Sequence, residues 1–497
     1  MKAIFRGLSV SMLALTAGGC VTPNPTPLNR TGDMPKAFTA PVVDTQSPIW
    51  PDANWWVNFK ADELPALMET AQKENLDIAA AAARVIEAEA TDAEAFANLL
   101  PAVNLQGGAT RTGSHTTPPV FTTGPGGVIT ETPGTTSFST TGNDFTAGLA
   151  ASYQLDFWGL NQDRLRQARE NLRSARYAET VIGLTTESSV AQEYFTVLAT
   201  RERIAITRQN IDAAKRILAV VEAKVVAGVS SNLDLANQQA VIAGQEATLP
   251  SLIEEEREAR YALAILLGRA PEGFDVNAQN MDGIASPVVQ GGLPSEMLLR
   301  RPDIAEAEAN LYAAHANVDA ARAAFFPAIG LTGSGSYAST VIGSLISPGN
   351  FAWSIGASLL QTIFDGGAKK AASDLALAQE QEQIADYRKA AFNAFSNVET
   401  ALGQVASDGD ELVALTEEVR ASTEAFRISE LQYREGTIDI LNLLQAQQTL
   451  FSAQNTLVQT KLARLEADVS LYIALGGGWT QQDSDKNYKY QLDWWPI

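Results

Sequence analysis

Residues 75–107, NLDIAAAAARVIEAEATDAEAFANLLPAVNLQG, and residues 301–333, RPDIAEAEANLYAAHANVDAARAAFFPAIGLTG, align without a gap, and thirteen of the 33 positions are identical. Many of the identities are alanine, so the shared order of features is the stronger sign: Asp-Ile, a helical stretch, a proline, then a strand-like stretch. A second pair, AGVSSNLDLANQQ (227–239) and EGTIDILNLLQAQ (435–447), is similar in the same way. The chain is therefore predicted to consist of two tandem structural repeats.

The stretch LLRRPDI (298–304) lies at the start of the second repeat, and its counterpart at the start of the first repeat is ENLDI (74–78). Two adjacent arginines could form a ligand site, but the repeat favours a structural joint as the role of Arg300 and Arg301. Asp303 follows Pro302 and is predicted to cap the helix that begins there, as Asp77 is predicted to cap its counterpart.

Each half begins with a predicted helix of about 24 residues, which ends before Pro101 or Pro327 because proline cannot continue a helix. Two stretches that alternate apolar with small or polar residues follow, and they predict β-hairpins at about 102–157 and 328–364. Residues 111–142, rich in Thr, Pro and Gly, are predicted to form a loop that faces the cell exterior. The alternating apolar positions are Phe145, Ala147, Leu149, Ala151, Tyr153, Leu155 and Phe157, and Phe351, Trp353, Ile355, Ala357, Leu359 and Ile363.

Nothing interrupts the helical pattern over residues 160–226, and residues 367–434 repeat that length. At about 1.5 Å per residue, each helix would be on the order of 100 Å long. Gly228 and Gly436 are predicted to turn the chain into a return helix, and Pro250 predicts a kink or a break in the first of these. A coiled-coil seam is predicted from residues spaced alternately by three and four: Ile204, Thr207, Ile211, Ala214, Leu218, Val221 and Val225, and Leu412, Leu415, Val419, Ser422, Phe426, Ser429 and Tyr433.

The four predicted strands have one apolar face, and their period alone fits equally a soluble sheet packed on a core or a sheet in a membrane. Aromatic residues at the strand ends favour the membrane, as does the N-terminus described below. Four strands cannot close a barrel, and open edges do not occur in hydrocarbon, so several chains would share one barrel. Two chains would give eight strands, a barrel of about the size that side chains fill, whereas three would give twelve, enough for a lumen. Three is preferred, so the predicted fold is mainly α with β: a trimeric twelve-stranded transmembrane β-barrel, continued by a long α-helical coiled-coil barrel.

The N-terminus combines Lys2 and Arg6 with an apolar stretch, LSVSMLALTA, and with the small residues Ala17-Gly18-Gly19 before Cys20, the only cysteine. This order is typical of a secretory signal peptide that is removed at a small-residue site. The chain is therefore predicted to be exported from the cytoplasm.

The net charge of −21 and the pI of about 4.6 oppose binding to nucleic acid. The chain has two histidines, His115 and His315, and no second cysteine, so no metal site is expected. Gly124-Pro125-Gly126-Gly127 lacks the Lys and Ser/Thr of a phosphate-binding loop. The chain is therefore predicted to be neither an enzyme nor a carrier of a cofactor.

Almost the whole mature chain resembles the trimeric outer-membrane factors of tripartite efflux systems, the TolC-like channels, and among them the NodT-type lipoproteins. The motifs that carry the resemblance are PSEMLLRRPDI (294–304), FFPAIGLTGSGS (325–336), QTIFDGG (361–367), YALAILLGRAP (261–271) and REGTIDILNLLQAQ (434–447). The resemblance implies a passive outer-membrane exit duct for drugs or other small solutes. The implied partners are two further copies of the chain, a periplasmic adaptor and an inner-membrane transporter of the RND type.

The residues before Cys20 resemble a lipobox, with Ala17 where leucine is usual. The resemblance implies that Cys20 is lipidated, and Val21 after it implies sorting to the outer membrane. A protein-secretion duct of type I systems is the alternative within the family. A structural coiled-coil lipoprotein is the alternative from another class.

The resemblance also implies a periplasmic gate near the turns at Gly228 and Gly436. Tyr433 and Asp234 match a latch in which a phenol donates a hydrogen bond to a carboxylate. Ile438 stands where a latch arginine is found in such channels, so Arg434 or Asp439 would have to replace it. Asn442 and Gln445 stand where the family has rings of aspartate.

Five segments are predicted: a signal peptide (1–19), a lipid-anchored N-terminal segment with an equatorial region (20–74), the first repeat (75–290), the second repeat (291–476) and a C-terminal tail (477–497).

Overall fold

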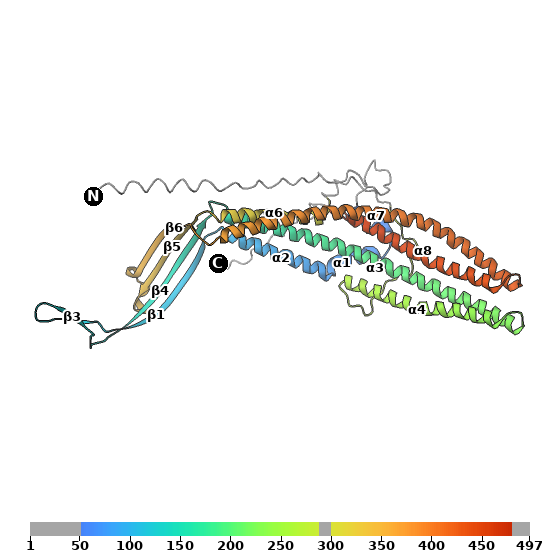
Figure 1. The fold of residues 1–497 in the computed structure, drawn as a ribbon, viewed down its shortest axis with the longest axis horizontal. Coiled ribbons are helices and arrows are strands. Elements are labelled where there is room, and N and C mark those ends of the chain that lie inside the picture. Colours follow the sequence, from blue (N-terminus) through green and yellow to red (C-terminus); the bar gives the residue numbers. More distant parts are fainter. Residues whose placement is uncertain (1–50, 288–299, 480–497) are drawn as a thin grey trace, which may run out of the picture.

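Two helices set the length of the molecule: α3 (Leu160–Val226) has 67 residues and α7 (Ala368–Glu435) has 68. In the computed structural model they run from a β-sheet at one end to two turns at the other, and shorter helices flank them (Figure 1). The structure describes residues 51–287 and 300–479. The predicted signal peptide, Cys20 and most of the predicted C-terminal tail therefore lie outside the described residues.

The two halves contain the same kinds of element in the same order. Helices η1 and α1 precede the first half, and a small hairpin is inserted between its two long strands. These two helices are η1 (Trp55–Phe59) and α1 (Leu64–Glu74). The first half comprises α2 (Leu76–Ala97), β1 (Ala102–Thr116), β2 (Val120–Thr123), β3 (Ile129–Thr132), β4 (Phe138–Leu155), α3 and α4 (Asn232–Leu266). The second half comprises α6 (Pro302–Ala323), β5 (Ala328–Ser339), β6 (Phe351–Leu360), α7 and α8 (Ile440–Ala474), with the short helices η2 (Ile342–Ser344) and η3 (Pro348–Asn350) inserted between its two strands.

The long helices pack as antiparallel pairs, α3 with α4 and α7 with α8, and α3 also contacts α2, α6 and α8. The residues predicted for the two seams are all buried or half-buried, so that prediction is confirmed. The chain turns between the helices of each pair at Gly228 (φ 73°) and Gly436 (φ 77°). Both glycines adopt the left-handed conformation that ends a helix without a side-chain clash.

Pro250 lies inside α4, which is one continuous helix from Asn232 to Leu266. The predicted alternative of a break at mid-height is therefore wrong. The proline side chain is exposed, where it does not have to fit between packed helices.

The four long strands form one antiparallel sheet in the order β1-β4-β5-β6. Because side chains alternate between faces, the pairing Leu105↔Leu149, Gly335↔Leu149 and Gly335↔Trp353 places these residues on the same face. We call this the apolar face; its larger members are Val103, Leu105, Phe145, Leu149, Tyr153, Leu155, Ile329, Leu331, Tyr337, Phe351, Trp353, Ile355 and Leu359. The opposite face has mostly Ser, Thr, Asn, Gln, Gly and Ala, so the sheet is amphipathic.

The stretch 111–142 is not the loop that its composition suggests. The β1–β4 ladder continues without interruption to the pair Thr116↔Phe138, and β2 and β3 form a second hairpin beyond it. Both faces of this extension carry polar residues, so alternation of apolar and polar residues does not reveal it. Threonine is β-branched and favours strands, which explains why a Thr-rich sequence forms a ladder here.

Arg301 is a structural joint, as the repeat predicts. Its side chain is 7% exposed, donates to the Ala474 carbonyl at 2.8 Å and pairs with Asp303 at 2.7 Å. Asn75 occupies the aligned position in the first half, and its Nδ2 donates to the Leu266 carbonyl at 2.8 Å. In each half, therefore, the start of the first helix is tied to the end of the return helix.

The predicted caps at Asp77 and Asp303 are wrong. Asn75 caps α2, since its Oδ1 accepts from the backbone N–H groups of Asp77 and Ile78 at 2.8 and 2.9 Å. Arg301 occupies the N-cap position of α6 and makes no side-chain capping bond there. Asp303 lies in the first turn instead, where its carboxylate accepts from the Arg301 guanidinium.

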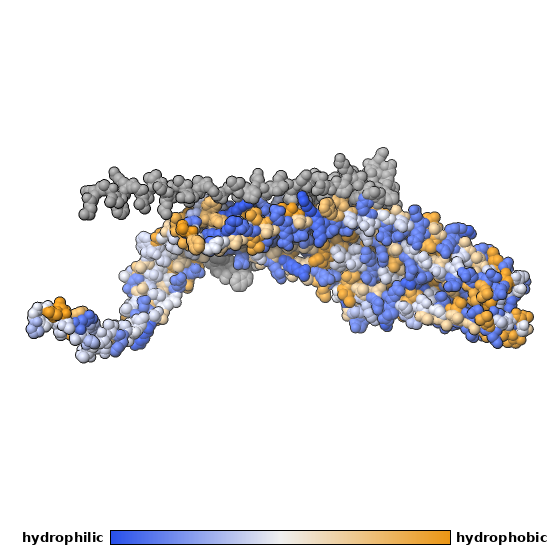
Figure 2. Space-filling view, in the orientation of Figure 1, coloured by the Kyte–Doolittle hydropathy of each residue, from blue (hydrophilic) through white to orange (hydrophobic). Residues whose placement is uncertain are grey.

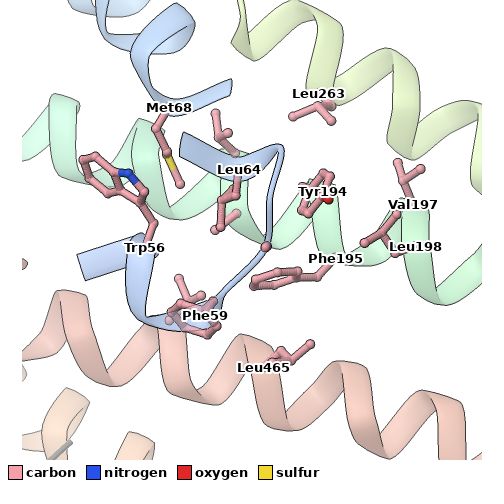
Figure 3. Close-up of a cluster of buried hydrophobic side chains, with 14 of the residues drawn as sticks. Trp56, Phe59, Leu64, Met68, Tyr194, Phe195, Val197, Leu198, Leu263 and Leu465 are labelled. Atoms are coloured by element: carbon pink, nitrogen blue, oxygen red, sulfur yellow. The ribbon is translucent and has the colours of Figure 1, made fainter. Parts of the chain in front are cut away.

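The largest apolar core lies midway along the helices, where η1 and α1 pack against α3, α4 and α8 (Figure 3). Phe59 contacts Phe195 of α3 with ring centroids 5.4 Å apart, and Trp55 stacks on Tyr472 of α8 at 5.5 Å. Because it joins both helix pairs, this equatorial core fixes their relative position at mid-height.

Candidate functional site

The candidate site is the tip, meaning the turns at Gly228 and Gly436 with the helix ends that adjoin them. A small apolar cluster joins the two helix pairs there: Ile217 and Val221 of α3 pack with Tyr433, Ile440 and Leu443. Apolar residues also gather on the visible surface of the tip in Figure 2. The exposed apolar residues at the first turn and the start of α8 are Val226, Val229, Leu233 and Leu441.

Tyr433 lies between the two helix pairs and is 5% exposed. Its hydroxyl makes no hydrogen bond of normal geometry with any described residue. Burial raises the pKa of Tyr433, and the hydroxyl of the neighbouring Ser230 opposes that rise. The phenol is therefore neutral at physiological pH.

Lys224 makes the polar contacts between the pairs that sequence reasoning missed. Its Nζ lies 4.2 Å from the centroid of the Tyr433 ring and donates to the Tyr433 backbone carbonyl. The cation thus meets a π-face and a carbonyl near the C-terminal end of α7, both of which favour positive charge. The position of Lys224 in the last turn of α3 is the one sequence feature that points to this residue. The sequence does not show which helix its side chain reaches.

Asp234 does not form the predicted bond with Tyr433. Its Oδ2 accepts from the Ser230 hydroxyl at 2.7 Å and from the Ser231 backbone N–H at 2.8 Å. The Ser231 N–H and the Ser230 hydroxyl hold the pKa of Asp234 below its usual value. With the Ser231 side chain, which accepts from the Asp234 N–H at 3.2 Å, the carboxylate forms a capping box at the start of α4. Ser230 thus stands between the carboxylate and the phenol.

The other candidate residues lie along the second turn, and in the part of the chain that the structure describes none of them makes a side-chain hydrogen bond with Tyr433. Arg434 pairs with Glu430 on its own helix at 2.6 Å. Asp439 caps α8 by accepting from the Leu441 N–H at 3.0 Å. Asn442 and Gln445 are exposed. None of these four makes a side-chain hydrogen bond or ion pair between the helix pairs among the described residues.

The two histidines lie far from this tip. His315 joins α6 to α7, with Nδ1 2.7 Å from a Glu380 carboxylate oxygen, and His115 is exposed on β1. Within residues 51–287 and 300–479, no helix is long and apolar enough to cross a bilayer.

Paired helices of this length, joined to an amphipathic sheet at one end and turned by glycines at the other, are the architecture of an outer-membrane efflux channel subunit. Residues 67–269 and 293–477 match the family described as outer membrane efflux protein. The chain belongs to this family.

The chain is 37% identical over 479 residues to the pyoverdine export outer membrane protein OpmQ of Pseudomonas aeruginosa, covering 95% of this chain and 97% of that protein. It is 30% identical over 433 residues to the cation efflux system protein CusC of Escherichia coli O6:H1, covering 86% and 89%. Among solved structures, the open state of the outer membrane channel MtrE of Neisseria gonorrhoeae superposes with a TM-score of 0.78, at 28% identity over 90% of this chain and 96% of that one. The chain is thus an efflux channel protein of the outer membrane.

Proposed function

We propose that three copies of the chain form one exit duct, a twelve-stranded transmembrane β-barrel continued by a tube of helices. The observation that carries this proposal is the sheet: it has an apolar face, and β1 and β6 are edge strands without a second neighbour among the described strands. Edge strands must be paired in hydrocarbon, and neighbouring copies supply the partners if β1 of one pairs with β6 of the next. The small polar face of the sheet would then line the lumen.

The proposed partners are a periplasmic adaptor and an inner-membrane transporter of the RND type. In support, the tip exposes Val226 and Val229 at 90% and 73%, on a chain that is otherwise rich in acidic residues. Exposed apolar residues gathered at one end are typical of a protein-docking surface. We propose that the adaptor meets the channel there.

The proposed cargo is drugs or other small solutes. The two relatives described above are named for pyoverdine export and for cation efflux. One type of duct could serve both kinds of solute, because the inner-membrane pump and not the duct would select the solute.

The direct test compares the parent strain, a deletion strain and the complemented deletion strain for sensitivity to panels of drugs and metals. Bilayer recordings of the purified protein measure its conductance. Sensitivity that complementation restores, with single-channel conductance, supports a solute duct. Loss of protein secretion alone would favour the type I alternative, and a protein without conductance would favour a structural lipoprotein.

We expect Cys20→Ser to leave a precursor that is not lipidated and is mislocalised, because the proposed acyl anchor needs the thiol. Mass spectrometry of the mature N-terminus in membrane fractions measures this. A wild-type N-terminus without any acyl mass would contradict it.

We expect the open duct to prefer cations. The chain has 57 acidic and 36 basic residues, and a thin-walled tube exposes much of that excess to its lumen. Reversal potentials under a salt gradient give the sign, and a preference for anions would refute the expectation.

A further inference from the structure

The apolar face of the sheet has a height that can be compared with a membrane. On β4 it extends from Leu155 to Phe145. These ten steps of about 3.4 Å, tilted by about 45°, span about 24 Å, which matches the apolar band of about 25 Å in outer-membrane barrels. Next to Phe145, Tyr337 and Phe351 are in contact with ring centroids 5.1 Å apart. These aromatic residues mark the outer boundary of the band.

Polar residues follow directly beyond this boundary on the same face. Arg111 pairs with Asn143, two residues past Phe145, and His115 pairs with Ser139. Gly113 lies between the two basic residues on this face, so no side chain separates them there. Arg111, Asn143 and His115 are all exposed.

The charge on this surface is one-sided. Arg111 and His115 are the only basic residues of β1, β4, β5 and β6, and none of these strands places an acidic residue on the apolar face or its extension. Asp144, the one acidic residue of the four strands, points to the opposite face. A surface of hydrogen-bond donors without acid stands out on a chain with a net charge of −21.

We propose that Arg111, together with Asn143 and His115, binds the phosphate groups of the phosphorylated glycolipid in the outer leaflet. This inference rests on the proposed barrel. In it, Arg111 lies about 5 Å beyond the apolar band, within the headgroup layer. A guanidinium binds phosphate with two parallel hydrogen bonds, and Asn143 opposite it adds a further donor. His115, about 14 Å beyond the band, reaches phosphates on sugars further out.

The test uses the purified full-length channel in detergent, titrated with bis-phosphorylated lipid A and with the same lipid after removal of its phosphates. Native mass spectrometry gives the bound fraction of each. We expect the wild type to prefer the phosphorylated lipid by about tenfold, and Arg111→Gln to lose most of that preference. Arg111→Lys should retain part of it, and adding His115→Gln to Arg111→Gln should remove the remainder.

Two controls separate the site from general charge and from the strand itself. Arg208→Gln removes an exposed base from α3, and Thr112→Gln alters the neighbouring residue on the opposite face. Both should bind like the wild type.

Equal binding of the two lipids by the wild type would by itself overturn the proposal. A preference for the phosphorylated lipid that is unchanged in Arg111→Gln would also overturn it. Bilayer recordings of the same preparations separate the two proposals. A conducting wild type without lipid preference refutes the glycolipid site alone, whereas a wild type that does not conduct refutes the duct.

Discussion

Gly268→Ala is expected to lower the unfolding temperature of the channel far more than Gly273→Ala. Both glycines have positive φ, 67° and 78°, so each substitution carries a left-handed strain of about 1–2 kcal/mol. At Gly268 a Cβ would also lie 2.1 Å from the Glu74 carbonyl oxygen, whereas at Gly273 it would meet nothing within 4 Å. Backbone atoms cannot move aside as a flexible side chain can. We therefore expect a total loss of more than about 3 kcal/mol at Gly268.

The second half offers an internal replicate. A Cβ on Gly476 would lie 2.2 Å from the Arg300 carbonyl oxygen, so Gly476→Ala should behave like Gly268→Ala. Thermal unfolding followed by tryptophan fluorescence, on samples matched for oligomeric state, measures the three variants side by side. If Gly268→Ala and Gly273→Ala shifted the transition equally, the close approach at the joint would not limit stability.

Lys224→Met is expected to raise the resting conductance of the channel. The lysine supplies the polar contacts between the helix pairs at the tip, a cation–π contact and a hydrogen bond to the Tyr433 carbonyl. Together these contribute about 1 kcal/mol or more per chain, and about 3 kcal/mol per channel if three copies act together. Methionine keeps the apolar stem but not the charge. Single-channel recordings and sensitivity to large antibiotics such as vancomycin measure the leak.

Lys215→Met is the matched control, because Lys215 pairs with Glu246 of α4 inside its own helix pair at 2.7 Å. It should conduct like the parent. The double variant Tyr433→Phe with Asp234→Ala tests the latch that the family resemblance implies, and we expect it also to increase leak, since it weakens the cap of α4 beside Tyr433. If neither Lys224→Met nor the double variant differed from the control, the gate would lie elsewhere.

The sequence predicts the helices and strands well where a single physical rule governs many residues. Regular spacing of apolar or small residues marks the seams from Ile204 and Leu412 onward, and alternation of apolar with small or polar residues marks most of β4 from Phe145 onward and most of β6. The extension of β1 to Thr116 escaped prediction because neither of its faces is apolar.

Predictions at single positions fared less well. The Asp-Ile pairs pointed to the right helix starts, but Asn75, two residues before Asp77, makes the capping bonds in the first half. Asp234 was matched to Tyr433 by resemblance, while in the structure the nearer Ser230 and Ser231 bind its carboxylate. Such choices depend on which donor lies within about 3 Å, and a one-dimensional pattern does not contain that distance.

If the tip moves, the equatorial core is the point about which the long helices would turn, because it joins both helix pairs at mid-height. From Phe195 to the end of α3 at Val226 there are 31 residue steps, a length of about 47 Å. A sideways displacement of the tip by about 5 Å would need a rotation of only about 6° at the core. A push at the tip would therefore reach the sheet only as a small change of helix angle. The strands would keep their register while the tip of the proposed tube opens.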